Sequence, residues 1–227
     1  NRLNDFENII KDTLFGGVVK NFGKNPFTSQ IDFTEFQKVQ DYLEQGVSIM
    51  TFFGHSSSGY GFSQNIDEPS NWNNQGKYPL VIGLGCYSGD VHNPDTNSFS
   101  EQLIRPTNSG AIAFMSTIKQ GFIPYINNYT EYLYKNIGKH GYGNTIGQQM
   151  LMTIDSMDQI SSSIISGPRF ECNYNGMSLQ GDPAVKVNSH PFPELVLDQQ
   201  SVWTEPSIID LSASTFELKF KVFNLGQ

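Results

Sequence analysis

Apolar residues gather in three short runs along the chain. The runs cover Val47–Phe53, Leu80–Leu84 and Ala111–Met115, and each is followed by a glycine or a serine. Because they are apolar at successive rather than alternate positions, they predict strands that are covered on both faces. Strands of this kind are typical of a mostly parallel sheet lying between layers of helices.

Segments between and after these runs have apolar residues at helical spacing. Asp32-Phe33-Thr34-Glu35 and Ser98-Phe99-Ser100-Glu101 are capping-box patterns, so each predicts the start of a helix. Two further helices are predicted, one over Pro124–Ile137 and one from an Asn144 cap to Met157. The order of elements predicts an α/β fold with a mostly parallel sheet and helices on both faces.

The end of the chain has a different pattern. From Pro191 onward prolines cluster, and Phe216–Val222 alternates apolar and charged residues as a half-exposed antiparallel strand does. We therefore predict two domains, residues 1–190 and residues 191–227. Because one or two strands are not stable alone, residues from Glu194 onward either pack on the main domain or form the cut edge of a second domain, and we predict the start of a truncated β-domain.

Composition narrows the classes of function. The 227 residues are 37% hydrophobic and 16% charged, which is typical of a folded globular protein. The formal net charge is −8 and the basic residues are scattered, which argues against nucleic-acid binding. No apolar run approaches the roughly 20 residues that a membrane-spanning helix needs. The chain begins without Met, so an upstream leader or segment is expected.

Two residues with catalytic potential follow predicted strands. His55 comes after the first run through Gly54, and Cys86 comes after the second through Gly85. The carboxyl ends of parallel strands meet at one edge of a sheet, so an imidazole and a thiol are expected side by side. A neighbouring imidazole is what a nucleophilic Cys requires, and the glycines leave backbone N–H groups available for an oxyanion. The alternative, an inert core Cys and a structural His, stays open on residue type alone.

Other chemistry is less well supported. Gly83–Gly89 imitates a dinucleotide-binding fingerprint, but Ser88 stands where the third glycine belongs. The four histidines lack zinc-ligand spacing. Asn93, Asp95 and Asn97 alternate as Ca²⁺ ligands do, yet the loop lacks the sixth-position Gly and the acidic twelfth ligand. We expect no metal and no cofactor, with Ca²⁺ at this loop as the weaker alternative.

Several motifs together resemble the gingipain-like cysteine peptidases, peptidase family C25. They are Phe53–Ser56, Gly85–Asp90, Gly110–Thr117 and Gly181–Pro183. The resemblance implies a caspase-like α/β fold followed by an immunoglobulin-like β-sandwich. It also implies a bacterial protein of the Bacteroidetes, because family members include the sortase of the type IX secretion system.

The resemblance also assigns roles to residues. It implies that His55 is the catalytic histidine, that Cys86 is the nucleophile, and that the backbone N–H groups of Cys86 and Ser56 bind the oxyanion. It places Phe53, Leu84 and Phe122 at the substrate pocket. The family usually has Gly where this chain has Ser56, and the third catalytic acid has no assignable position. The three pocket positions are apolar, so no preference for Arg or Lys is carried over.

These observations predict a cysteine peptidase acting on peptides or proteins, either an endopeptidase or a sortase-type transpeptidase. We expect it to be secreted, or exposed at the cell surface or to the periplasm, with secretion-system components as partners. The alternative is a catalytically inactive relative that serves as a binding or secretion-assembly module. A nucleotide-binding protein is the weakest of the readings.

Overall fold

The computed structural model describes residues 2–11, 14–23, 33–59, 61–62, 66, 68–92, 98–163, 167–187, 195–197, 201–208 and 215–224. The chain divides into two compact units, Asn1–Val187 and Asn188–Gln227. None of the helices in these ranges is long and apolar enough to span a membrane.

The first unit is built around a four-stranded mixed sheet in the order β1-β4-β5-β6. The strands are β1 (Ile49–Phe53), β4 (Leu80–Leu84), β5 (Ala113–Thr117) and β6 (Met177–Gly181). The first three pair in parallel, which confirms the three predicted strands as neighbours, and β6 pairs antiparallel with β5. The third strand starts two residues later than predicted, because the backbone N–H of Ala111 bonds to Leu103 instead of the sheet.

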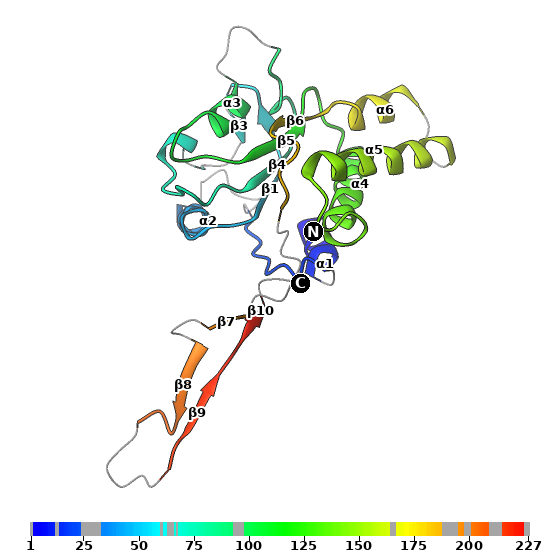
Figure 1. Cartoon of the computed structure of the whole chain (residues 1–227). Coiled ribbons are helices and arrows are strands. Elements are labelled where there is room, and N and C mark those ends of the chain that lie inside the picture. Colours follow the sequence, from blue (N-terminus) through cyan, green and yellow to red (C-terminus); the bar gives the residue numbers. More distant parts are fainter. Residues whose placement is uncertain are drawn as a thin grey trace. The chain divides into compact units, whose positions relative to one another are not determined.

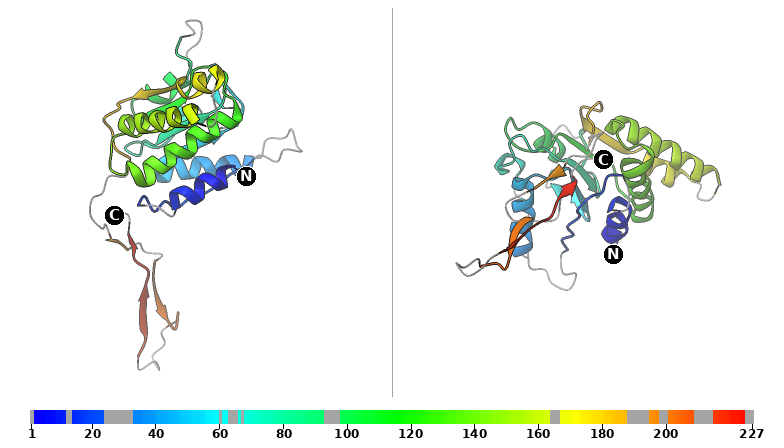
Figure 2. Two further views of the ribbon diagram at one scale, coloured as in Figure 1. Left: turned by 90° about the vertical axis from the view of Figure 1, so that its right-hand side faces the viewer. Right: turned by 60° about the horizontal axis from the view of Figure 1, so that its bottom comes forward.

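Helices cover both faces of this sheet, as predicted. Side chains of β4 alternate between the two sides, since Leu80 and Ile82 belong to one core cluster and Val81 to another. The first cluster includes residues of α1 (Arg2–Lys11), α4 (Ile123–Lys135), α5 (Ile146–Ser163) and α6 (Pro168–Tyr174). The second includes residues of α2 (Phe33–Gln45) and α3 (Phe99–Ile104). Figure 1 shows the sheet between these layers, and Figure 2 shows α4 and α5 crossing one face of it.

Local capping signals set the starts of the helices. Ser98 and Glu101 form the predicted capping box of α3. At α5 the cap is Thr145 and not Asn144: Gln148 donates its N–H to the Thr145 hydroxyl at 3.3 Å, and the Gln148 side chain accepts from the N–H of Thr145 at 3.0 Å. The Thr-x-x-Gln pattern satisfies two helix-end donors at once, which a lone Asn cannot do. Asp32 lies outside the described residues.

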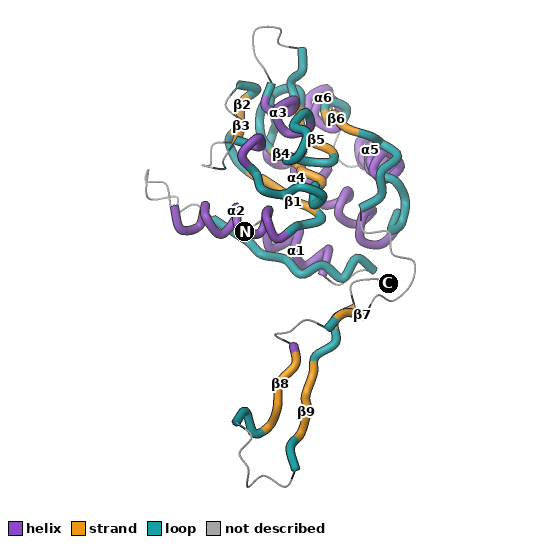
Figure 3. The backbone as a smooth tube through the Cα atoms, turned by 60° about the vertical axis from the view of Figure 1, so that its left-hand side comes forward, coloured by secondary structure: helices purple, strands orange, loops and turns teal. Residues whose placement is uncertain are grey.

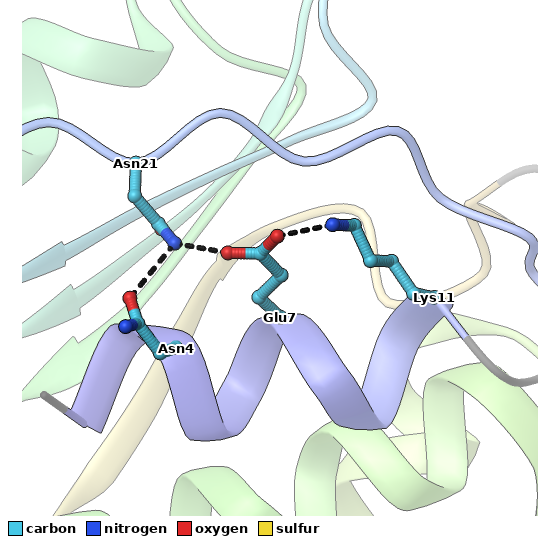
Figure 4. A network of polar contacts seen from close by, with 4 residues as sticks. All are labelled: Asn4, Glu7, Lys11 and Asn21. Carbon is cyan, nitrogen blue, oxygen red and sulfur yellow. Dashed lines mark hydrogen bonds and ion pairs between the residues drawn. The ribbon is translucent and has the colours of Figure 1, made fainter.

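The N-terminal helix α1 was not predicted. It packs on α4, where Phe6 stacks on Tyr134 with ring centroids 5.6 Å apart. Figure 4 shows how α1 holds the extended segment that follows it: the Asn21 amide donates to Asn4 at 3.2 Å and to Glu7, which also pairs with Lys11. These polar contacts are exposed, so the aromatic packing is expected to stabilise the docking of α1 more than they do.

Two short strands follow β1 and hold the loop after it. β2 (Ser56–Ser57) pairs antiparallel with β3 (Gly61–Phe62), beside α3 as Figure 3 shows. The buried Phe62 ring stacks on Phe52 with centroids 4.1 Å apart and meets Phe99 edge-on at 4.8 Å. Phe52 before the His55 loop and Phe62 after it are both buried in the core, so the loop is anchored at both of its ends. The remaining short helical turns are η1 (Pro69–Asn71) and a π-helical turn after α4, η2 (Asn136–His140).

Within its described residues, the second unit contains two antiparallel strand pairs. β7 (Leu195–Val196) pairs with β10 (Phe223–Asn224), and β8 (Val202–Glu205) pairs with β9 (Glu217–Phe220). The predicted alternating strand is present as β9. However, its apolar residues Leu218 and Phe220 are 59% and 57% exposed, because two strand pairs offer too little surface to bury an apolar face. The assignment of residues 191–227 to an immunoglobulin-like domain stays a prediction.

Candidate active site

The site forms where β1 and β4 end side by side. Phe53 pairs with Leu84 in the parallel register, and the N–H of Gly54 donates to the Leu84 carbonyl at 3.2 Å. His55 and Cys86 each stand two residues beyond that last pair. Neighbouring strands are about 4.8 Å apart, so the register brings the backbones of the two residues together.

The two side chains differ in their surroundings. His55 is exposed, whereas Cys86 is partly buried with its Sγ 3.9 Å from the Gly121 carbonyl oxygen. Within the described part of the chain, no hydrogen bond joins the imidazole to the thiol. Catalytic hydrogen bonds are often long in the absence of substrate and tighten when it binds, so the lack of this bond does not argue against the predicted pair.

The peptide groups around Cys86 are tied to neighbouring elements. The Thr117 hydroxyl donates to the Gly85 carbonyl, the Ser56 hydroxyl donates to the Cys86 carbonyl at 2.8 Å, and the N–H of Tyr87 donates to the Lys119 carbonyl at 2.9 Å. Tyr87 itself has φ of 58°, in the left-handed region that a non-glycine residue rarely adopts. Such backbone outliers persist where the surroundings over-determine them, which they do most often at functional sites.

These hydrogen bonds fix the direction in which the N–H of Cys86 points. In a trans peptide the carbonyl and the N–H point to opposite sides, and the Gly85 carbonyl points toward Thr117 of β5. The N–H of Cys86 therefore points away from β5, and no acceptor among the described residues meets it. A fixed and unoccupied N–H next to a nucleophile is the kind of donor that stabilises an oxyanion.

Comparisons with known proteins identify the family. The model of peptidase family C25 matches residues 7–188. The chain belongs to peptidase family C25. Two solved structures are similar to it: the complex of Porphyromonas gingivalis RgpB pro- and mature domains (TM-score 0.66, 16% identity, 87% of this chain and 46% of that one) and the Arg-specific cysteine proteinase gingipain R (TM-score 0.65, 15% identity, 87% and 45%).

At these identities the structural likeness establishes the fold, which is the caspase-like core of the gingipains. This C25 chain spans less than half the length of either solved structure. No curated protein matches its sequence.

The predicted pocket residues lie in different settings. Phe122 is partly exposed and directly follows Gly121, whose carbonyl is in contact with the Cys86 sulfur. Phe53 is partly buried and meets Phe6 of α1 edge-on, with centroids 6.4 Å apart. Leu84 is 2% exposed and belongs to the core. The structure thus places the residue before Phe122 in contact with the thiol, and the pocket role of all three stays a prediction.

Residues that the sequence did not single out support this site. Asn173 is 7% exposed, accepts the N–H of Phe122 at 2.8 Å and donates to the Arg169 carbonyl at 2.8 Å. The Arg169 guanidinium lies 5.6 Å from the Phe122 ring centroid. Gln180 of β6 donates to the carbonyl of Gly89, three residues after Cys86, at 3.1 Å. No local pattern marks Asn173 or Gln180, because each acts on a partner far along the chain.

The Ca²⁺ alternative predicted from the sequence concerns the loop between His92 and Ser98. Asn93, Asp95 and Asn97 lie outside the residues that the structure describes. Elsewhere in the described ranges, no group of three His, Cys, Asp or Glu side chains is placed to hold a metal ion.

Proposed function

We propose that this chain carries the catalytic part of a secreted cysteine peptidase, with Cys86 as the nucleophile and His55 as its acid–base partner. The observation that carries the proposal is the in-register pairing of β1 and β4, which sets His55 and Cys86 at the same edge of the sheet. Membership of family C25 supports the same chemistry. His55 is exposed and Cys86 is partly exposed, which is compatible with access of a peptide to both side chains.

The proposed reaction proceeds through an acyl-enzyme. His55 accepts the proton of the Cys86 thiol, and the thiolate attacks the carbonyl carbon of the scissile peptide bond. The negative charge that forms on the carbonyl oxygen is stabilised by the backbone N–H groups of Cys86 and Ser56. Collapse of the intermediate breaks the C–N bond, and the imidazolium gives its proton to the leaving amine. Water or a second amine then attacks the thioester and releases Cys86.

The choice of acceptor separates an endopeptidase from a sortase-type transpeptidase. Water yields a free carboxylate, whereas an amine yields a new amide bond. Secretion-system components, including those of the type IX system, are proposed partners for a transpeptidase exposed at the bacterial surface.

An electrophilic peptide probe tests the proposal directly. Wild-type protein should become covalently labelled at Cys86, as located by mass spectrometry, and the Cys86→Ala variant should remain unlabelled. A wild-type protein that takes up no probe at Cys86 would favour the alternative of an inactive relative that serves as a binding or assembly module. Ser56 in place of the usual family Gly is the feature that keeps this alternative open.

Phe122 is proposed to shape the primary substrate pocket, together with Phe53 and Leu84. Its backbone adjoins the carbonyl beside the thiol, and the Asn173 bond holds its N–H in place. Phe122→Ala should lower kcat/KM for the preferred peptides about tenfold, because loss of an apolar wall costs roughly 1–3 kcal/mol in discrimination. A peptide-library cleavage profile measures this effect.

Ile123→Ala is the matched control, since Ile123 is the next residue and is 57% exposed. It should keep the wild-type profile. An unchanged preference in Phe122→Ala at the residue before the scissile bond would remove Phe122 from the pocket.

A further inference from the structure

We infer that the side-chain hydroxyl of Ser56 is a positioning group for the nucleophile, tying the loop of His55 to the peptide of Cys86. The inference rests on the proposed function and concerns the side chain of Ser56, which is distinct from its backbone N–H. It gives a physical role to the residue at which this chain departs from the family pattern.

The first observation is a direct bond between the two catalytic loops. Ser56 Oγ donates to the carbonyl oxygen of Cys86 at 2.8 Å, in a partly buried position. The two residues are 30 positions apart in the sequence. Ser56 is also the first residue of β2, where it pairs with the buried Phe62. The donor is thus held by a strand pair that is itself anchored in the core.

The second observation is the close fit between Ser56 and Gly85. A Cβ atom at position 85 would lie 2.1 Å from Ser56 Oγ and 2.6 Å from the Gly54 carbonyl oxygen. The hydroxyl therefore occupies the space that only a glycine at position 85 leaves open. Ser56 and Gly85 act as a complementary pair, and the hydroxyl lies against the peptide that precedes the nucleophile.

The third observation is that the Cys86–Tyr87 peptide is held at both ends. Ser56 binds its carbonyl from the β1 side, and the Lys119 carbonyl accepts its N–H at 2.9 Å from the β5 side. Without the hydroxyl, the Cys86 carbonyl loses its partner and the peptide is held on one side only. Because the thiol and the proposed oxyanion donors sit on these same loops, a small shift changes the attack geometry, and shifts of about 1 Å cost up to about 100-fold in rate.

Ser56→Ala tests the role, with Ser58→Ala as its control. Ser58 is a serine of the same loop whose hydroxyl bonds to no residue in the described part of the chain. Active sites are first counted by titration to completion with the electrophilic peptide probe, and kcat and KM are then measured per titrated site. We expect Ser56→Ala to titrate fully, to melt within about 4 °C of wild type, and to show kcat about tenfold lower with KM within about twofold of wild type. Ser58→Ala should match wild type throughout.

The measurements on Ser56→Ala distinguish a role of the hydroxyl in positioning the nucleophile from a role in folding. A kcat per titrated site that equals wild type in Ser56→Ala would overturn the inference, as would a loss seen only in the number of titratable sites, which indicates a structural role. Failure of the proposed function looks different: wild type would then be as inert as Cys86→Ala toward both probe and peptides, and both proposals would fall together.

Discussion

Replacement of Cys86 by alanine is expected to abolish peptide cleavage. Without the thiol no acyl-enzyme can form, and loss of a nucleophile typically costs a factor of about a thousand or more in kcat. The fold should survive the change, because Cys86 lies beyond the end of β4 and outside both core clusters. Initial rates on a fluorogenic peptide, with circular dichroism as the check of folding, measure the effect.

Cys172→Ala provides the matched control for this experiment. Cys172 is the other cysteine of the chain, and it is exposed on α6. Its replacement should leave the cleavage rate within about twofold of wild type, as is usual for surface substitutions. Equal activity of the Cys86→Ala and Cys172→Ala proteins would show that neither thiol is the nucleophile.

Removal of the His55 imidazole is expected to have the second-largest effect. A general acid–base residue contributes about 100-fold to 10,000-fold to the rate, so kcat of His55→Ala should fall within that range. The thiol should also lose its special reactivity, because an imidazolium beside a thiol favours the nucleophilic thiolate. In wild type, iodoacetamide should label Cys86 faster than Cys172, and in His55→Ala the two rates should become similar.

His140→Ala is the control for loss of an imidazole. His140 is exposed at the end of η2 and belongs to no part of the proposed site. The variant should keep wild-type cleavage and labelling. If His55→Ala retains both full cleavage and the labelling difference between the two cysteines, the catalytic pair is refuted. If the two cysteines of wild type are labelled at similar rates and cleavage still depends on His55, then His55 acts as a general base alone.

The contacts of Ser56 and Asn173 concern how the proposed site is held, not what it consists of. Ser56 joins the two catalytic loops, and Asn173 holds the backbone of Phe122. Substitutions at such positions change geometry by fractions of an ångström, so their effects on rate are expected to be smaller than those at Cys86 and His55.

The sequence by itself determined the features that depend on residues close together in the chain. Apolar runs located β1, β4 and, to within two residues, β5, since strands that lie between two layers of helices are mostly apolar. The Ser98 capping box placed α3, because both of its hydrogen bonds form within one turn. The glycines before His55 and Cys86, together with the rule that strand ends meet, placed the two residues at one edge of the sheet.

Only the tertiary structure decided the features that depend on residues far apart. β6 joins β5 as an antiparallel edge strand, although its sequence Met-Ser-Leu-Gln-Gly carries little strand signal, because pairing with β5 supplies the hydrogen bonds. The bond from Ser56 to Cys86 spans 30 residues, and that from Asn173 to Phe122 spans 51. Such bonds leave no local pattern, since each partner is an ordinary polar residue or backbone group until the fold brings the two within reach.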